Sequence, residues 1–271
     1  MEQEREFITI LELLGKVIEV NKGIVQTNEK FTEAEFLATK FFFHCASSFY
    51  LSRGTIVPDF PLCPIDFIDA ASINVVARAS VESFLVFHYV FSASISEEEA
   101  DFRFYSWQLG GLKERGKYLP KVEILKQQAA TTITNDKKCI QKYEQILQRN
   151  NVFLNLSKKK QNDILNGKWR TESWREIALD AGLSEMHAEH FYRLLCGYAH
   201  SSSLSTLQLS QADTPDKKAI LFGATMGVLK IAMSNLIFEY CKLFPKSKEE
   251  IDKHEQAKMI AENWIEIGQK V

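Results

Sequence analysis

The chain is poor in residues that break helices. Its 271 residues include 12 glycines and 6 prolines, well below the usual share of these two residues in globular proteins. Sustained alternation of apolar and polar residues, the pattern of a half-buried strand, is missing as well. We therefore expect an all-α fold, a single bundle-like domain over residues 1–271 with about eight to nine helices. Its core is expected at 60–243, with N-terminal helices in 1–56 and a C-terminal helix in 248–271.

An excess of charge of one sign is also missing, and so are paired cysteines. The 33 Lys and Arg against 35 Asp and Glu give a net charge of −2, which excludes a strongly cationic nucleic-acid-binding protein but not a local basic patch. The five cysteines are scattered without a C-x-x-C pair, as expected for free thiols in a reducing cytoplasm. The first residues lack the cationic and apolar regions of a secretory signal, and the apolar runs are shorter than the roughly 18–20 residues of a membrane span. We expect a cytoplasmic protein without membrane contact.

Motifs for common cofactors are absent from the sequence. We find no G-x-G-x-x-G, P-loop or G-x-S-x-G, and neither an H-E-x-x-H nor a cysteine pair completes a metal site with the scattered histidines. The expectation is therefore no cofactor and no metal. Gly223 and Gly227 form a G-x-x-x-G within an apolar segment, which indicates close packing against a neighbouring helix.

Signals for helix starts are frequent. Four S/T-x-x-E capping boxes begin at Thr32, Ser96, Ser173 and Ser247, and Thr214 precedes a proline suited to the first helical turn. The helices are expected near 3–20, 33–52, 64–94, 97–116, 120–149, 174–181, 185–200, 215–243 and 248–267.

A polar stripe follows one face of an otherwise apolar helix at 65–91. Asn74, Arg78 and Glu82 are spaced four apart, so their side chains share that face. An Arg and a Glu buried without partners would each cost several kcal/mol, on the order of the desolvation penalty of a single ion. The pair is therefore expected either to hold helices in register as a structural ion pair or to support a polar site.

A second polar stripe lies near the end of the helix at 185–200. The stripe contains, at spacings of three, four and three, the residues His190, Arg193, Gly197 and His200. Because Gly197 has no side chain, it leaves a notch between Arg193 and His200. Arg offers a fork of donors suited to phosphate, and His exchanges a proton near neutral pH. The set could serve phosphodiester chemistry, or it could be an ordinary helix end in which His200 complements the helix dipole. Because buried charges seek common partners, this helix and the helix of Arg78 are expected to lie within side-chain reach of each other.

A local basic segment lies at 151–175. Lys158, Lys159 and Lys160 stand close to Trp169 and Trp174, so the segment could contact phosphate and stack on bases. The alternative is a solvated loop between helices with both tryptophans packed inward.

The stretch RLLCGYAH, from Arg193 to His200, resembles the signature of HEPN-type helical domains. Together with the R-x-x-x-E of Arg78 and Glu82 and the Y-R that precedes the motif, it is also similar to a group of uncharacterised bacterial helical proteins. The HEPN resemblance implies a homodimer with RNA or a nucleotide as partner, and in active members a metal-independent endoribonuclease. Arg193 would then stabilise the phosphate and His200 would be the general acid or base, with Asn74, Arg78, Glu82 and His190 in support. Leu194 departs from the polar residue usual after the arginine. The alternative is a non-catalytic interaction or scaffold protein in which the Arg, Glu and His side chains form a buried structural network.

Overall fold

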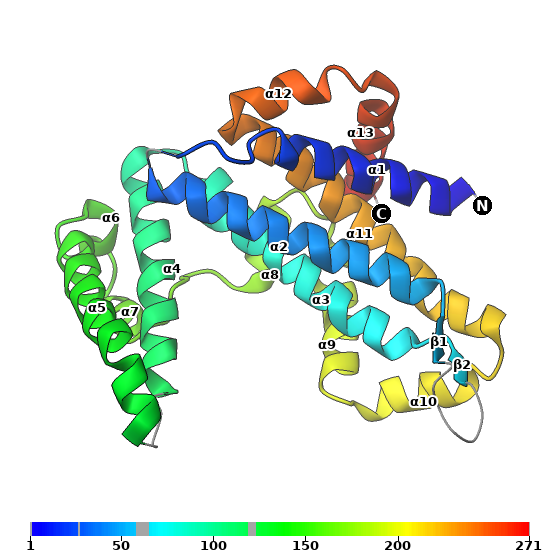
Figure 1. The fold of residues 1–271 in the computed structure, drawn as a ribbon, viewed down its shortest axis with the longest axis horizontal. Helices are drawn as coiled ribbons and strands as arrows, with labels where there is room; N and C mark the ends of the chain where they lie inside the picture. Colours follow the sequence, from blue (N-terminus) through cyan, green and yellow to red (C-terminus); the bar gives the residue numbers. More distant parts are fainter. Residues whose placement is uncertain (1, 27, 58–64, 119–122, 271) are drawn as a thin grey trace. The chain divides into compact units, whose positions relative to one another are not determined.

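The protein is described by a computed structural model at residues 2–26, 28–57, 65–118 and 123–270. In these residues the chain forms thirteen α-helices, two π-helical segments and two short strands (Figure 1). The helices are α1 Glu2–Glu19, α2 Glu29–Ser52, α3 Ala70–Phe87, α4 Glu97–Lys117, α5 Glu123–Leu147, α6 Asn151–Leu154, α7 Lys158–Leu165, α8 Trp174–Asp180, α9 Tyr192–Ala199, α10 Ser203–Gln211, α11 Pro215–Leu243, α12 Pro245–Ile251 and α13 Glu255–Lys270, with the π-helical segments η1 His88–Ser92 and η2 Met186–Phe191.

The chain divides into two compact units. Unit 1 comprises Met1–His88 and Trp174–Val271, and unit 2 comprises Tyr89–Ser173. The expectation of a single domain over residues 1–271 stays a prediction, because a compact unit is not by itself an independently folding domain.

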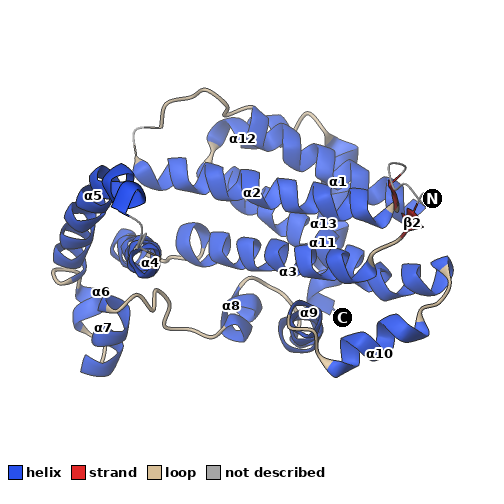
Figure 2. Cartoon of the chain, turned by 60° about the horizontal axis from the view of Figure 1, so that its bottom comes forward, coloured by secondary structure: helices blue, strands red, loops and turns tan. Residues whose placement is uncertain are grey.

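Unit 1 is built around α11, which contacts α1, α2, α3 and α13. Leu229, Met233, Leu236 and Tyr240 follow one another at helical spacing along α11 and are fully buried. Figures 1 and 2 both show α2 running alongside α3, and the two helices share extensive contacts. This packing of long apolar helices fixes the backbone of α3, from which the polar side chains of the candidate site project.

Unit 2 has a core of its own. Helix α4 packs against α5, α6 and α7. The buried side chains at this junction are Phe102, Leu109, Tyr143, Leu147, Phe153 and Ile164. These residues come from all four helices, so the short helices α6 and α7 complete a core that α4 and α5 alone would leave open.

The prediction of eight to nine helices was wrong, because the described residues contain thirteen α-helices. The additional helices α6, α7 and α10 are too short for a visible 3.6-residue period, yet each has a side-chain cap. Asn150, Ser157 and Ser202 accept hydrogen bonds from the backbone N–H groups of Phe153, Lys160 and Ser205. The expected C-terminal helix at 248–267 is divided into α12 and α13.

The expectation that no sheet exists was also wrong. Strands β1 Thr55–Val57 and β2 Ile65–Phe67 pair in antiparallel orientation, with Ile56 opposite Asp66. A ladder of three residues does not show sustained alternation in the sequence, which is why the pattern search missed it.

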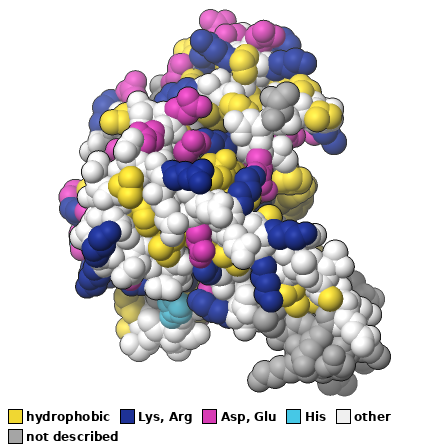
Figure 3. Space-filling model, turned by 90° about the vertical axis from the view of Figure 1, so that its left-hand side faces the viewer, with side chains coloured by type: hydrophobic (Ala, Val, Ile, Leu, Met, Phe, Trp, Pro, Cys, Tyr) yellow, Lys and Arg dark blue, Asp and Glu magenta, His cyan; other side chains and the backbone are white. Residues whose placement is uncertain are grey.

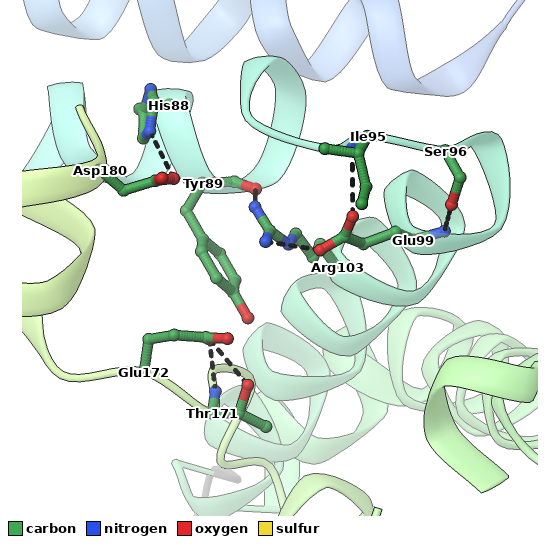
Figure 4. A network of polar contacts seen from close by, with 9 residues as sticks. All are labelled: His88, Tyr89, Ile95, Ser96, Glu99, Arg103, Thr171, Glu172 and Asp180. Atoms are coloured by element: carbon green, nitrogen blue, oxygen red, sulfur yellow. Dashed lines mark hydrogen bonds and ion pairs between the residues drawn. The ribbon is translucent and has the colours of Figure 1, made fainter. Parts of the chain in front are cut away.

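The capping boxes were predicted with mixed success. Ser96 Oγ accepts from Glu99 N at 3.1 Å, and Glu99 Oε2 accepts from Ile95 N at 3.1 Å, so this start is confirmed (Figure 4). Helix α2 instead begins earlier, with Asn28 as its cap. Ser247 lies inside α12, where its hydroxyl donates to Val17 O at 2.6 Å and does not cap a helix.

Among the residues that the structure describes, two helical stretches are long and apolar enough to cross a membrane by length and composition alone, Ala70–Ser92 and Pro215–Leu243. The expectation that the apolar runs are shorter than a membrane span does not hold for these two helices. In each stretch more than half of the most apolar window is buried inside the protein, and the core helix of a soluble protein passes the same test.

Candidate functional site

The two polar stripes meet where α3 contacts α9. Arg78 Nε donates to Glu82 Oε1 at 3.1 Å, and Tyr192 Oη donates to the same carboxylate oxygen at 2.6 Å. On its other side, Arg78 Nη1 lies 3.3 Å from His200 Nε2. The predicted proximity of the two helices is therefore confirmed. We call Arg78, Glu82, Tyr192 and His200 the α3–α9 cluster.

The α3–α9 cluster is partly open to solvent. The side chains of Arg78 and Glu82 are 23% and 31% exposed, and His200 is exposed. Because a guanidinium only donates, the contact between Arg78 and His200 requires a lone pair on His200 Nε2, and thus a neutral imidazole protonated at Nδ1. Burial and the neighbouring Glu82 carboxylate raise the pKa of the Tyr192 phenol above its ordinary value, so the phenol keeps its proton and its bond to Glu82.

The position of His200 is set by the way α9 ends. Ser202 N donates to Gly197 O at 2.9 Å and Ser201 N donates to Tyr198 O at 3.3 Å, the bond pattern of a Schellman motif with His200 as the C-cap residue. Ser201 has a φ of +50°, the left-handed conformation that this motif requires after the cap. A Cβ on Gly197 would lie 2.9 Å from Ser202 Oγ. The notch expected at Gly197 is thus filled by the turn and leaves no room there for a ligand.

Arg193 does not take part in this cluster. Its side chain is 76% exposed, and Nη2 donates to Glu189 Oε1 at 3.1 Å, one turn earlier on the same face. Glu189 also lies 3.5 Å from Arg175 Nε. No described hydrogen bond or ion pair joins Arg193 to His200. His190 is exposed, and no hydrogen bond or ion pair found among the described residues involves it.

Asn74 belongs to the packing of the core. It is fully buried; its Nδ2 donates to Ala70 O at 2.9 Å and its Oδ1 accepts from the hydroxyl of Thr225 on α11. Although Asn74 stands one turn before Arg78 on α3, its side chain is occupied by these two bonds. It therefore supports the site through the position of α3 relative to α11.

Lys158, Lys159 and Lys160 form the exposed first turn of α7 in unit 2, whereas the α3–α9 cluster belongs to unit 1. Lys158 Nζ donates to Gln161 Oε1 at 3.1 Å. The segment is therefore helical in part and not the continuous loop that one interpretation expected. On the face drawn in Figure 3, Lys and Arg side chains are interspersed with Asp and Glu side chains.

A second charged cluster, in which His88 and Glu239 are buried and Asp180 is exposed, was not predicted from the sequence. His88 Nδ1 lies 2.6 Å from Glu239 Oε1, and His88 Nε2 lies 3.1 Å from Asp180 Oδ2 (the latter contact is drawn in Figure 4). Both ring nitrogens face carboxylate oxygens, so both carry protons in this geometry. Burial lowers the pKa of His88, but hydrogen bonds and charge from Glu239 and then Asp180 outweigh it and raise this pKa above its ordinary value.

His88 interrupts an apolar run, and that interruption was the only signal in the sequence. Its partners stand 92 and 151 residues away along the chain, beyond the reach of any local pattern. The contact ties the end of α3 to α8 and α11 within unit 1.

The chemistry open to the α3–α9 cluster follows from these contacts. A neutral imidazole beside a guanidinium can accept a proton while the guanidinium holds an anion. No group of three or more His, Cys, Asp or Glu side chains suited to a metal ion is present among the residues that the structure describes.

The fold and the site define an all-helical protein with a partly exposed Arg–Glu–Tyr–His cluster between two helices. Comparison with known families then gives its membership: residues 66–218, more than half of the chain, match a family of unknown function, DUF5677. The chain belongs to this family, and the expectation of an uncharacterised helical family is thereby confirmed. No curated protein and no solved structure matches the chain.

Proposed function

We propose that the protein binds phosphate groups of RNA or of a nucleotide at the α3–α9 cluster. The observation that carries the proposal is the 3.3 Å approach of Arg78 Nη1 to His200 Nε2 at a partly exposed surface. A phosphate oxygen at this position would accept from the guanidinium. Once the imidazole is protonated, His200 Nε2 would no longer accept from Arg78 and would donate to the phosphate as well. Glu82 supports the proposal because its bond to Arg78 holds the guanidinium in place before a ligand arrives.

The same proposal includes a reaction, the metal-independent cleavage of RNA. His200 Nε2, as a lone-pair acceptor, would take the proton of a ribose 2′-hydroxyl. The 2′-oxygen would attack the adjacent phosphorus and the bond from phosphorus to the 5′-oxygen would break. The His200 imidazolium, which carries the proton taken from the 2′-hydroxyl, would return that proton to the leaving oxygen. Arg78 would stabilise the charge that develops on the phosphate oxygens.

The resemblance to HEPN domains enters this proposal through the Arg193-to-His200 spacing, and it carries with it the expectation of a homodimer. The geometry changes the role of one residue. Because Arg193 is exposed and bonded to Glu189, we assign it an outer contact with a neighbouring phosphate, and we give Arg78 the position beside His200.

Binding is tested with a fluorescein-labelled single-stranded RNA of mixed sequence, by anisotropy at fixed low salt. His200→Ala and Arg78→Lys should each weaken binding by about tenfold, since a charge-assisted hydrogen bond contributes roughly 1.5–3 kcal/mol. His254→Ala is the matched control, because this histidine of unit 1 bonds to Glu250 and should leave binding unchanged. Equal binding by the parent protein and both cluster variants would contradict the proposal.

Cleavage is tested on the same RNA in EDTA. The parent protein should leave 2′,3′-cyclic phosphate and 5′-hydroxyl ends, and His200→Ala should lose the activity while retaining its melting temperature. Cleavage that EDTA abolishes would refute the metal-independent mechanism and would leave the binding proposal to the anisotropy measurement.

A second function is favoured by the fact that the polar groups of the cluster already bond to one another. Tyr192, Glu82 and Arg78 form a chain of bonds between α3 and α9, as a non-catalytic interaction or scaffold protein with a structural network would require. This network is partly exposed and so is not the buried one expected from the sequence. Under this hypothesis Glu82→Gln lowers the melting temperature and no variant changes RNA binding. Thermal melts and anisotropy on one set of variants therefore separate the two functions.

A further inference from the structure

Unit 1 contains a cavity that is separate from the α3–α9 cluster. It has a volume of about 510 Å³ and is lined by residues of α1, α2, α11 and α13, together with Arg53 directly after α2. A volume of this size suits a small organic molecule. Its walls are mainly apolar and include Phe7, Phe49, Phe222, Met226 and Trp264.

The glycine pair of α11 leaves the cavity open. A Cβ on Gly223 would meet no atom within 4 Å, and a Cβ on Gly227 would meet only Trp264, at 3.9 Å. The sequence pattern was interpreted as a site of close helix packing, but the space beside Gly223 is empty of protein atoms. Each glycine in a helix interior costs about 1 kcal/mol relative to alanine. What the two glycines provide in this structure is volume in the cavity.

One wall of the cavity carries a buried ammonium group. The side chain of Lys230 is only 3% exposed; its Nζ lies 3.2 Å from Glu6 Oε2 and 3.7 Å from the centroid of the Trp264 ring. An ammonium has three N–H donors, and these two contacts occupy two of them. Burial lowers the pKa of Lys230, and Glu6 only partly opposes this effect. A bound anion would offset the same desolvation.

A second cation lines the cavity from the end of α2. The Arg53 side chain is 60% exposed, and its Nη1 lies 3.9 Å from Glu4 Oε1. Among the residues that line the cavity, Lys230 and Arg53 are cationic and Glu4 is anionic, while Glu6, which pairs with Lys230, lies outside the lining. The combination of aromatic walls with two cations matches a molecule that has an apolar body and one negative group.

We propose that this cavity binds a carboxylic acid with an apolar body, a medium-chain fatty acid or an aromatic acid, whose carboxylate pairs with Lys230 and Arg53. The apolar body lies against the aromatic walls, in the space that Gly223 leaves open. The proposal does not depend on the α3–α9 cluster, since no residue of that cluster lines the cavity.

Isothermal titration calorimetry of the whole protein with octanoate and with 1-octanol tests the charge requirement. The parent protein should bind octanoate about tenfold more tightly than 1-octanol, as expected for one charge-assisted hydrogen bond. Lys230→Met removes the charge, keeps an unbranched side chain, and should remove this preference while leaving octanol binding unchanged. Lys217→Met, on the exposed start of the same helix, is the control and should retain the preference.

Gly223→Leu tests the location, because its Cβ would meet no atom within 4 Å and the rest of its side chain would occupy volume in the cavity. This variant should lose the binding of both probes while its melting temperature is maintained. Gly111→Leu is the matched control, since Gly111 is also a helical glycine whose Cβ would meet no atom within 4 Å. Absence of binding to the parent protein, equal affinity for the two probes, or binding that survives Gly223→Leu would each overturn the proposal.

Discussion

Gly268 of α13 offers a sharp test of the packing between α13 and α11. A Cβ at this position would lie 2.5 Å from Ile231 Cγ2, and 3.4 Å and 3.5 Å from two further atoms of the same side chain. Ile231 is 2% exposed and branched at Cβ, so in a helix it strongly prefers one χ1 rotamer and resists moving away. Gly268→Ala therefore forces the two helices apart by about 1 Å, with an expected cost of roughly 1–3 kcal/mol.

Gly223→Ala is the comparison, because it adds the same methyl group to a helix of the same unit in open space. It should stabilise the protein by about 0.5–1 kcal/mol through helix propensity. A change of 1 kcal/mol shifts the melting temperature of a protein this large by about 2–4 °C. Differential scanning calorimetry should thus show Gly268→Ala melting below the parent and Gly223→Ala above it. Both variants melting above the parent would refute the tight contact between Gly268 and Ile231.

Four further predictions concern charged groups and assembly. His88→Ala should destabilise unit 1 by about 3–5 kcal/mol in urea titrations, because it leaves the buried Glu239 without its partner; a loss below 1 kcal/mol would contradict the buried pair. The pKa of His88 is raised in the folded state, so its stabilising contribution is complete below pH ~6.5 and is lost as the pH rises through the folded-state pKa; the urea midpoint of the parent should fall over that range, and a His88→Gln variant should lack this component. Arg193→Ala should change stability by less than about 1 kcal/mol, since its pair with Glu189 is exposed, and a large fall in melting temperature would place it in a buried network after all. Sedimentation velocity at micromolar concentration should show a homodimer, and a monomer would count against the HEPN-like proposal.

The contact between α3 and α9 could be predicted from the sequence because its cause is local. Arg78 and Glu82 lie four residues apart in an apolar helix, and desolvation requires them to find polar partners. The all-helical fold followed similarly from the scarcity of glycine and proline. These inferences need only the spacing of residues along one helix.

The face shared by His190, Arg193 and His200 could not be predicted correctly, because the backbone is not a regular α-helix over that stretch. Segment η2 is π-helical through Phe191, and α9 ends at Ala199. A wider turn before Arg193 and a reversal after Ala199 break the 3.6-residue register on which the shared face depended. A local ion pair also directs Arg193 away from His200, since the Glu189 carboxylate lies four residues earlier, within reach of the Arg193 guanidinium.

The burial of Lys230 could not be predicted, because its partners are distant in the sequence. In the sequence Lys230 ends an apolar stretch and resembles the polar boundary of a buried helix. In the structure it is buried and contacts Glu6 and Trp264, 224 and 34 positions away. Such partners come together only through the packing of α1, α11 and α13.

The left-handed Ser201 after α9 has a consequence for the dynamics of the His200 corner. A side chain at this position of a Schellman motif carries strain of order 1 kcal/mol that glycine would not. Helix α9 has only eight residues, so its last turn is expected to fray readily, and amide hydrogens there should exchange with solvent faster than those of α3 or α11. Ser201→Gly should slow this exchange without touching any member of the α3–α9 cluster. The backbone conformation at Ser201, a residue outside the cluster, thus determines how rigidly the His200 imidazole is held beside Arg78.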